Sequence, residues 1–183
     1  STHDYIMFFT NKGKVYRLKA YELPEASRTA KGTAIVNLLQ LDQGEKVAAI
    51  MPVKDYNAEL YVLMATRNGL IKKTKLEEYS NIRKSGLQGI TLKEDDELID
   101  VRLTDGSNDV VMVTQSGLSI RFKEEEVRPV GRTSMGVKGI TLANDDKVVG
   151  MEPVANNDDY ILAITENGFG KRTELEEYRS QCR

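Results

Sequence analysis

One pattern of hydrophobic and polar positions recurs four times along the chain, without gaps, over stretches of fourteen residues. Each copy begins at the end of an apolar run, turns at a glycine and continues into a run of mixed apolar and basic residues. The copies are TNKGKVYRLKAYEL (10–23), TRNGLIKKTKLEEY (66–79), TQSGLSIRFKEEEV (114–127) and TENGFGKRTELEEY (165–178). The sequence therefore predicts an array of structural repeats.

The fourth position of every copy is a turn glycine, namely Gly13, Gly69, Gly117 and Gly168. β-rich runs precede these glycines (YIMFFT, LYVLMAT, DVVMVT and YILAIT), and shorter β-rich runs follow them. Two such runs joined at a glycine predict a β-hairpin, because the turn requires a positive φ that glycine adopts without strain. The turn glycines recur about every 50 residues, the period of a propeller blade or a solenoid unit.

A second set of glycines, Gly32, Gly89 and Gly139, precedes apolar runs (AIVNLLQL, ITL and ITL) that we expect to be strands. An acidic turn and another apolar strand follow each of them. Only KLEEY and ELEEY suggest a single helical turn or a loop. We therefore expect an all-β, propeller-like array (a β-pinwheel or β-propeller) of four-stranded blades in one domain fragment, 1–183. Its approximate units are 4–58, 59–107, 108–156 and a partial 157–183, an incomplete set of blades.

Composition indicates a folded protein, with 40% hydrophobic and 30% charged residues. No apolar run approaches the roughly 20 residues of a membrane-spanning helix, so we expect a cytoplasmic protein without membrane contact. Cys182 and His3 are the only residues of their types. The sequence thus predicts no metal site, no cofactor and no catalytic constellation.

The formal net charge of −2 argues against a nucleic-acid partner, but phosphate recognition depends on where the cations lie. The eighth motif position is basic in every copy, and the tenth is basic in three copies, with Glu174 in the fourth. Residues two apart on a strand share a face, so successive hairpins could present a stripe of cations. The eighth position holds Arg17, Lys73, Arg121 and Arg172, the tenth holds Lys19, Lys75 and Lys123, and the seventh adds Lys72 and Lys171.

More basic residues surround the later glycines, in SRTAKG (27–32), IRKSGLQG (82–89), GRTSMGVKG (131–139) and YRSQCR (178–183). Glycine beside lysine or arginine lets backbone amides and a cation approach one phosphate together. The glutamates and aspartates form separate runs, which would confine a polyanion to one track. The alternative reading is a solvated sheet surface whose charges only discourage aggregation.

HDYIMFFTNKGKVYRLKAYELPEASRTAKGTAIVNLLQL (3–41) resembles the C-terminal domain of the A subunit of DNA gyrase, in the type II topoisomerase family. The resemblance continues through GLIKKTKLEEY, SIRFKEEEVRPVGRTSMGVKGI and ENGFGKRTELEEY. It implies a β-pinwheel whose basic perimeter wraps double-stranded DNA and presents it for strand passage during supercoiling. The perimeter cations it implies are Arg17, Lys19, Arg28, Lys31, Lys72, Lys73, Lys75, Arg83, Lys84, Arg121, Lys123, Arg128, Arg132, Lys138, Lys171, Arg172, Arg179 and Arg183.

The family's glycine-rich box, QRRGGKG, is absent, and SRTAKG and GRTSMGVKG look like degenerate forms of it. The resemblance therefore implies a DNA-bending segment that lacks its anchor and neither cuts DNA nor hydrolyses ATP. In the parent ATP-dependent topoisomerase, the partners would be the rest of the same polypeptide and the B subunit, in a heterotetramer at the nucleoid. Two alternatives stay open: the corresponding C-terminal domain of topoisomerase IV, and a propeller scaffold for protein partners.

Overall fold

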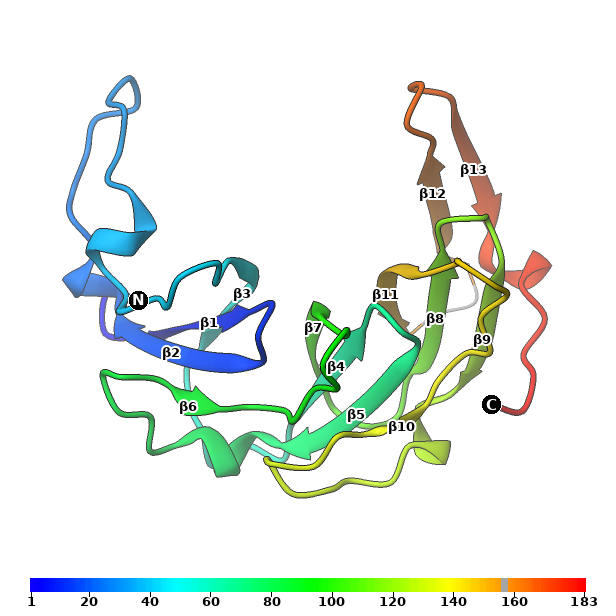
Figure 1. Cartoon of the computed structure of the whole chain (residues 1–183), viewed down its shortest axis with the longest axis horizontal. Helices are drawn as coiled ribbons and strands as arrows, with labels where there is room; N and C mark the ends of the chain where they lie inside the picture. Colours follow the sequence, from blue (N-terminus) through cyan, green and yellow to red (C-terminus); the bar gives the residue numbers. More distant parts are fainter. Residues whose placement is uncertain (156–157) are drawn as a thin grey trace.

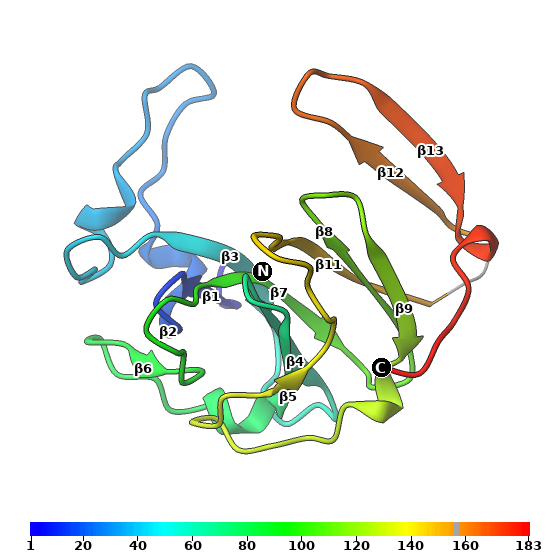
Figure 2. The ribbon, with the colours of Figure 1, turned by 45° about the vertical axis from the view of Figure 1, so that its right-hand side comes forward.

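The computed structural model describes residues 1–155 and 158–183 as a curved, open array of small antiparallel sheets (Figure 1). The sheets follow one another along an arc, with the N-terminal unit at one end and the last hairpin at the other (Figures 1 and 2). The predicted all-β, propeller-like class is confirmed.

Four hairpins define four units, which we number in chain order. The hairpins are β1 (Tyr5–Thr10) with β2 (Lys14–Lys19), β4 (Tyr61–Thr66) with β5 (Leu70–Lys75), β8 (Asp109–Thr114) with β9 (Ser119–Lys123), and β12 (Tyr160–Ile164) with β13 (Gly170–Glu174). The turn glycines Gly13, Gly69, Gly117 and Gly168 have φ values of +77°, +86°, +89° and +81°. Each unit thus turns at the same backbone geometry.

The first three hairpins each gain a strand on the side of their first strand. These inner strands are β3 (Val47–Val53), β7 (Leu98–Thr104) and β11 (Val148–Val154), which pair antiparallel with β1, β4 and β8. Short 3-10 turns complete the secondary structure: η1 (Ala20–Glu22), η2 (Ile35–Asn37), η3 (Leu76–Tyr79), η4 (Glu124–Glu126) and η5 (Leu175–Glu177). The single turns expected in KLEEY and ELEEY are therefore confirmed as η3 and η5.

Neighbouring units exchange a short strand. β6 (Leu87–Gln88) belongs to the second unit but pairs with β2, and β10 (Val137–Lys138) belongs to the third unit but pairs with β5. The amides of Gly89 and Gly139 then donate to the carbonyls of Gly13 and Gly69, both at 2.8 Å. Each exchanged strand therefore completes the outer edge of the preceding hairpin.

The exchange corrects the prediction of strands in AIVNLLQL and the two ITL runs. The paired residues stand before the second-set glycine, and the ITL runs carry no strand. A Cβ at Gly89 would lie 2.5 Å from Val15 Cγ2, so a side chain at this position would clash with the preceding hairpin. The sequence could not show that the glycine serves the preceding unit, since its contact partner is about 70 residues away in the chain.

Among the described residues, two hydrophobic clusters lie between units, whereas a third, with Phe8, Tyr16 and Leu39, lies inside the first unit. Met7 and Phe9 of β1 pack with Met64 of β4 in one cluster, whereas Leu63 of β4 packs with Met112 of β8 in the next. Alternate residues of β4 point to opposite faces of its sheet, so the two faces are buried against different neighbours. A hairpin inside the array is consequently stabilised from both sides.

We expect alanine at Gly69 to cost more stability than alanine at Gly117. Both positions have positive φ, which alone costs a Cβ-bearing residue about 1 kcal/mol. A Cβ at Gly69 would also lie 2.8 Å from the Ile140 carbonyl oxygen, whereas Gly117 has nothing within 4 Å. Displacing the exchanged segment should add about 2 kcal/mol to the loss for Gly69→Ala, measured by urea unfolding. Equal losses would show that the exchange contributes nothing to stability.

Candidate nucleic-acid interface

The basic residues at the eighth motif position join neighbouring units. Arg17 Nη1 donates to the carbonyl of Ser80 at 2.6 Å, and Lys73 Nζ donates to the carbonyl of Glu124 at 3.0 Å. Arg121 Nη1 donates to the carbonyl of Leu175 at 2.9 Å. In each case the acceptor lies in, or directly after, the 3-10 turn of the next unit. We call Arg17, Lys73 and Arg121 the inter-unit cations.

Burial separates two of these cations from any surface ligand. Lys73 is 4% exposed, and its ammonium lies 3.7 Å from Oε1 of the fully buried Glu124. Arg121 is 8% exposed and donates through Nε to Asp109 Oδ2 at 2.7 Å. The carboxylates compensate charges that would otherwise be buried at high cost. The expectation that Lys73 and Arg121 face a polyanion is therefore contradicted.

Lys72, from the seventh motif position, is also internal. Its ammonium donates to the carbonyl of Gly89 at 2.6 Å and to the carbonyl of Arg132, so it links the loops that carry β6 and β10. Burial lowers the pKa of Lys72 to about 8. The expected role of Lys72 as a perimeter cation is thus also contradicted, because a phosphate cannot reach a side chain of 0% exposure.

The other cations of the hairpins lie nearer the surface. Lys75, Lys123, Lys171 and Arg172 are exposed, and Lys19 is half-buried. Lys19 and Arg172 stand over tyrosine rings, at 3.5 Å from the Tyr5 centroid and 3.9 Å from the Tyr160 centroid. Lys123 pairs with Asp109 at 2.7 Å. These side chains remain accessible, although part of their charge is already compensated.

The basic residues around the later glycines lie in the segments that follow each hairpin and its 3-10 turn, and one of them, Lys138, lies in β10. All of them are exposed except the half-buried Arg132. They are Arg28 and Lys31 in the first loop, Arg83 and Lys84 in the second, Arg128, Arg132 and Lys138 in the third, and Arg179 and Arg183 in the last segment. We call the surface formed by these nine residues the loop surface.

Arg132 and Arg183 are held by the same arrangement, one unit apart. The Arg132 amide donates to Glu78 Oε2 at 2.8 Å, and its Nη1 donates to the carbonyl of Gln88 at 2.6 Å. The Arg183 amide donates to Glu126 Oε2 at 3.1 Å, and its Nη1 donates to the carbonyl of Lys138 at 2.8 Å. Both guanidinium groups are therefore positioned beside an exchanged strand before any ligand arrives.

Aspartates of the acidic turns accept hydrogen bonds from backbone amides of the hairpin turns, so they stabilise those turns as well as contributing negative charge to the surface. Asp96 Oδ1 accepts from the Asn68 amide at 2.9 Å, and Asp146 Oδ1 accepts from the Ser116 amide at 3.0 Å. The hydrogen bond from the Ser116 side chain is the main reason that the pKa of Asp146 falls to about 2. Recurring carboxylates in the sequence therefore indicate turn anchors, a role that their charge alone does not reveal.

Within residues 1–155 and 158–183, no three histidine, cysteine, aspartate or glutamate side chains gather as metal ligands would. No helix in the same described ranges has the length and apolar character needed to cross a bilayer.

Strand exchange and a repeated basic loop define a propeller-type repeat domain. A family model described as "DNA gyrase C-terminal domain, beta-propeller" matches residues 4–54, 60–105, 108–155 and 159–183. The chain belongs to this family, as a C-terminal domain of DNA gyrase A.

Curated relatives agree with this assignment. The chain is 56% identical over 183 residues to the A subunit of DNA gyrase from Clostridium acetobutylicum, and the match covers 100% of this chain and 22% of the relative. It is 48% identical over 181 residues to the same subunit from Staphylococcus epidermidis, covering 98% of this chain and 20% of the relative. The chain thus spans about a fifth of the length of these relatives.

Two solved structures share the fold. A crystal structure of the C-terminal domain of DNA topoisomerase IV superposes with a TM-score of 0.92 at 37% identity, covering 100% of this chain and 57% of that one. A structure of the DNA gyrase A C-terminal domain gives a TM-score of 0.83 at 28% identity, covering 100% and 58%. The fold is therefore common to the C-terminal domains of both enzymes.

Lys73→Met should destabilise the array by about 3 kcal/mol, because it leaves the Glu124 carboxylate buried without its cation. Lys75→Met is the matched control, since Lys75 is exposed two residues further along the same strand. Urea unfolding measures both. The double variant Lys73→Met/Glu124→Gln should recover part of the loss. If the double variant is no more stable than Lys73→Met alone, the buried charge is not the cause.

The Lys72 pKa predicts a pH dependence of stability. The ordinary lysine value is 10.5, so between pH 8 and pH 10 the folded chain releases this proton before the unfolded chain does. The free energy of unfolding should therefore rise with pH across that window, by about 2 kcal/mol. Above pH 10 the raised pKa values of Tyr16 and Tyr79 act in the opposite direction. Lys72→Met should lack the rise; an identical pH profile for both proteins would contradict the assignment.

Proposed function

We propose that this domain binds and bends double-stranded DNA without catalysing a reaction, and that it wraps DNA for strand passage. The observation that carries the proposal is the loop surface, which places basic side chains at equivalent points of successive units. The units follow an arc (Figure 1), so a polyanion that contacts several of them follows the same curvature.

The chemistry of the loop surface suits phosphate. Arginine presents several N–H donors in a planar group, and one fixed nitrogen orients the rest. In both Arg132 and Arg183, Nη1 already donates to a carbonyl of an exchanged strand. Each side chain therefore loses less rotamer freedom on binding phosphate than an unanchored arginine would. Exposed Arg83 and Lys84 lie in the loop next to β6, and exposed Arg128 lies in the loop before β10. Each of two neighbouring units thereby offers a small group of cations.

The proposed recognition of DNA depends little on the base sequence of the duplex. The loop surface consists of loops and two-residue strands, none of which is an element shaped for the major groove. Contacts would go to the DNA backbone, and any preference would come from how readily a sequence bends. The buried cations contribute indirectly, because they fasten successive units and so fix the arc along which the loop surface lies.

We propose that, in the whole enzyme, this domain lies beside the rest of the gyrase A polypeptide and the B subunit. That enzyme would be an ATP-dependent topoisomerase in the cytoplasm. The domain would hold one DNA segment near the site of strand passage. Chemistry would be done by parts of the enzyme that this chain does not include, since its sequence motifs contain no catalytic constellation.

The double variant Arg83→Glu/Lys84→Glu should weaken binding to a duplex of about 150 base pairs, one DNA persistence length, on the order of tenfold. The log–log slope of affinity against salt should become shallower by about 2, because each phosphate neutralised contributes about 0.9. Fluorescence anisotropy across a salt titration measures both. Energy transfer between the DNA ends reports the bend.

Lys93→Glu/Lys147→Glu is the matched control, because it makes the same change of charge at sites in the acidic turns. Net charge alone would weaken binding equally in the two double variants. Equal effects would therefore show that the loop surface is not the DNA track. A salt slope near zero for the unaltered protein would favour a protein partner instead.

A further inference from the structure

An open pocket of about 600 Å³ lies at the joint between the first and second units. Three arginines line it, one from each of three successive units: Arg17 from β2, Arg83 from the segment before β6, and Arg132 from the segment before β10. No aspartate or glutamate of the described chain lines it. A concave surface lined by charges of one sign concentrates ions of the opposite sign, so the pocket is suited to an anion.

Arg17 differs from the other two inter-unit cations because it has no carboxylate partner. Lys73 pairs with Glu124, and Arg121 pairs with Asp109. Among the described residues, no ion pair includes Arg17. Its guanidinium is held instead by a backbone carbonyl and by an aromatic ring. The charge of this cation is therefore positioned but not neutralised.

The other cations around the pocket are in the same condition. Arg83, Arg132 and the buried Lys72 belong to no ion pair of the described chain. Lys72 donates to the Arg132 carbonyl, so its charge lies directly beneath that residue. Among the described hydrogen bonds and ion pairs, one carboxylate contacts this group, because Glu78 Oε2 accepts from the Arg132 amide. An anion in the pocket would balance the remaining positive charge.

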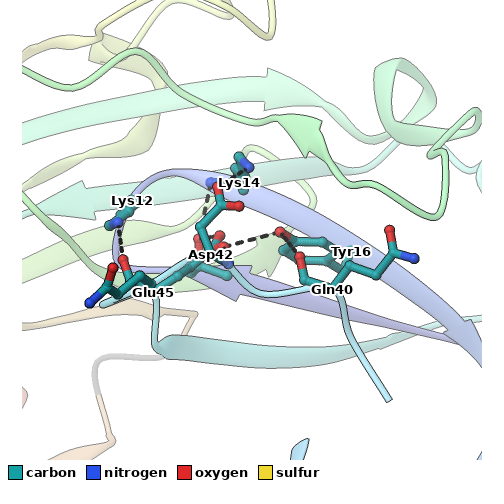
Figure 3. Close-up of polar contacts among 8 residues, drawn as sticks. Lys12, Lys14, Tyr16, Gln40, Asp42 and Glu45 are labelled. Atoms are coloured by element: carbon teal, nitrogen blue, oxygen red, sulfur yellow. Dashed lines mark hydrogen bonds and ion pairs between the residues drawn. The ribbon is translucent and has the colours of Figure 1, made fainter. Parts of the chain in front are cut away.

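The cations at the turn of the first hairpin are engaged already (Figure 3). Lys14 Nζ lies 2.5 Å from Asp42 Oδ2, and Lys12 Nζ donates to the Gln43 carbonyl at 2.6 Å. The hydrogen bond to Asp42 raises the pKa of Lys14 above its ordinary value. Positive charge on this hairpin therefore lacks a partner at the pocket and not at the turn.

The next joint along the array does not repeat the pocket. Counted from the second-set glycines, Thr133 stands where Arg83 stands in the preceding unit. Lys73, which corresponds to Arg17, is 4% exposed beside a buried carboxylate. Of the two joints that exchange a strand, one therefore gathers three arginines. A ligand held there would have a single defined position on the array.

We propose that this pocket binds a phosphate group through Arg17, Arg83 and Arg132. Guanidinium groups donate paired N–H bonds to phosphate oxygens, and two of the three are held in place before binding. One phosphate would contact three units at once and oppose their separation. Two sources share this chemistry: a backbone phosphate of bound DNA, which rests on the proposed function, and a small phosphate compound, which does not.

NMR of the 20.5 kDa chain titrated with inorganic phosphate tests the pocket, with sodium chloride at equal ionic strength as the reference. The amide signals of Gly86 and Gln88, which line the pocket, should shift and saturate. Arg83→Gln should weaken this binding about tenfold, because it removes a charged hydrogen-bond donor. Arg83 is exposed, so circular dichroism should stay unchanged.

Lys12→Gln is the matched control, because it removes the same charge from the hairpin turn. Its affinity for inorganic phosphate should equal that of the unaltered chain. Shifts that sodium chloride reproduces would overturn the proposal, and so would equal losses of affinity in the two variants.

Displacement of DNA distinguishes the two sources. Inorganic phosphate or sodium chloride is added at equal ionic strength to the complex with a duplex of about 150 base pairs, and anisotropy is recorded. If a backbone phosphate occupies the pocket, inorganic phosphate should displace more DNA than chloride does, and Arg83→Gln should abolish the difference. Equal displacement beside a saturating NMR titration would assign the pocket to a small phosphate compound. Absence of DNA binding would contradict the proposed function alone, since the NMR titration uses no DNA.

Discussion

The whole architecture depends on the fact that a single β-hairpin cannot bury both of its faces or satisfy its outer edge alone. In this chain the next unit supplies the missing parts. It contributes an apolar face, a two-residue strand, and the carbonyl groups of a 3-10 turn that accept from the inter-unit cations. Cooperation between neighbours is therefore a condition for each unit to exist, and the stability of the array is a sum over joints.

Lysine and arginine either join neighbouring units or lie on the loop surface, and the burial of each side chain distinguishes the two roles. The inter-unit cations lie under the turn of the following unit, where two of them meet buried carboxylates. The cations of the loop surface lie beyond that turn and face solvent. Recurrence at a motif position thus marks a structural need as readily as a ligand contact. Lys73 and Arg83 are both basic and both lie in the second unit, yet only Arg83 is exposed to solvent.

Much of the fold could be predicted from the sequence, because its determinants are local. A glycine between two β-rich runs specifies a hairpin, and a repeat of about 50 residues specifies an array of similar sheets. The exchanged strand could not be located, since Leu87 and Gln88 form too short a run and their partners, Val15 and Lys14, belong to another unit. The sequence also does not show that Asp96 holds a hairpin turn, because the Asn68 amide that it accepts from is 28 residues away in the chain.

The candidate site, like the fold, could be predicted from the sequence only in part. Period-two alternation correctly places Arg17 and Lys19 on one face, beside the ring of Tyr5. It carries no information on what covers that face, so the burial of Lys73 and Arg121 could not be foreseen. The anchoring of Arg132 and Arg183 depends on glutamates 54 and 57 residues away. Contacts of that range are set by how units stack, and stacking is absent from any local pattern.

The brevity of the exchanged strands has a mechanical consequence. Within a unit, strands of five to seven residues are tied by continuous ladders, whereas β6 and β10 span only two residues each. A load applied along the arc would therefore meet the fewest backbone hydrogen bonds at the joints, where the packed side chains and the inter-unit cations make up the rest of the connection.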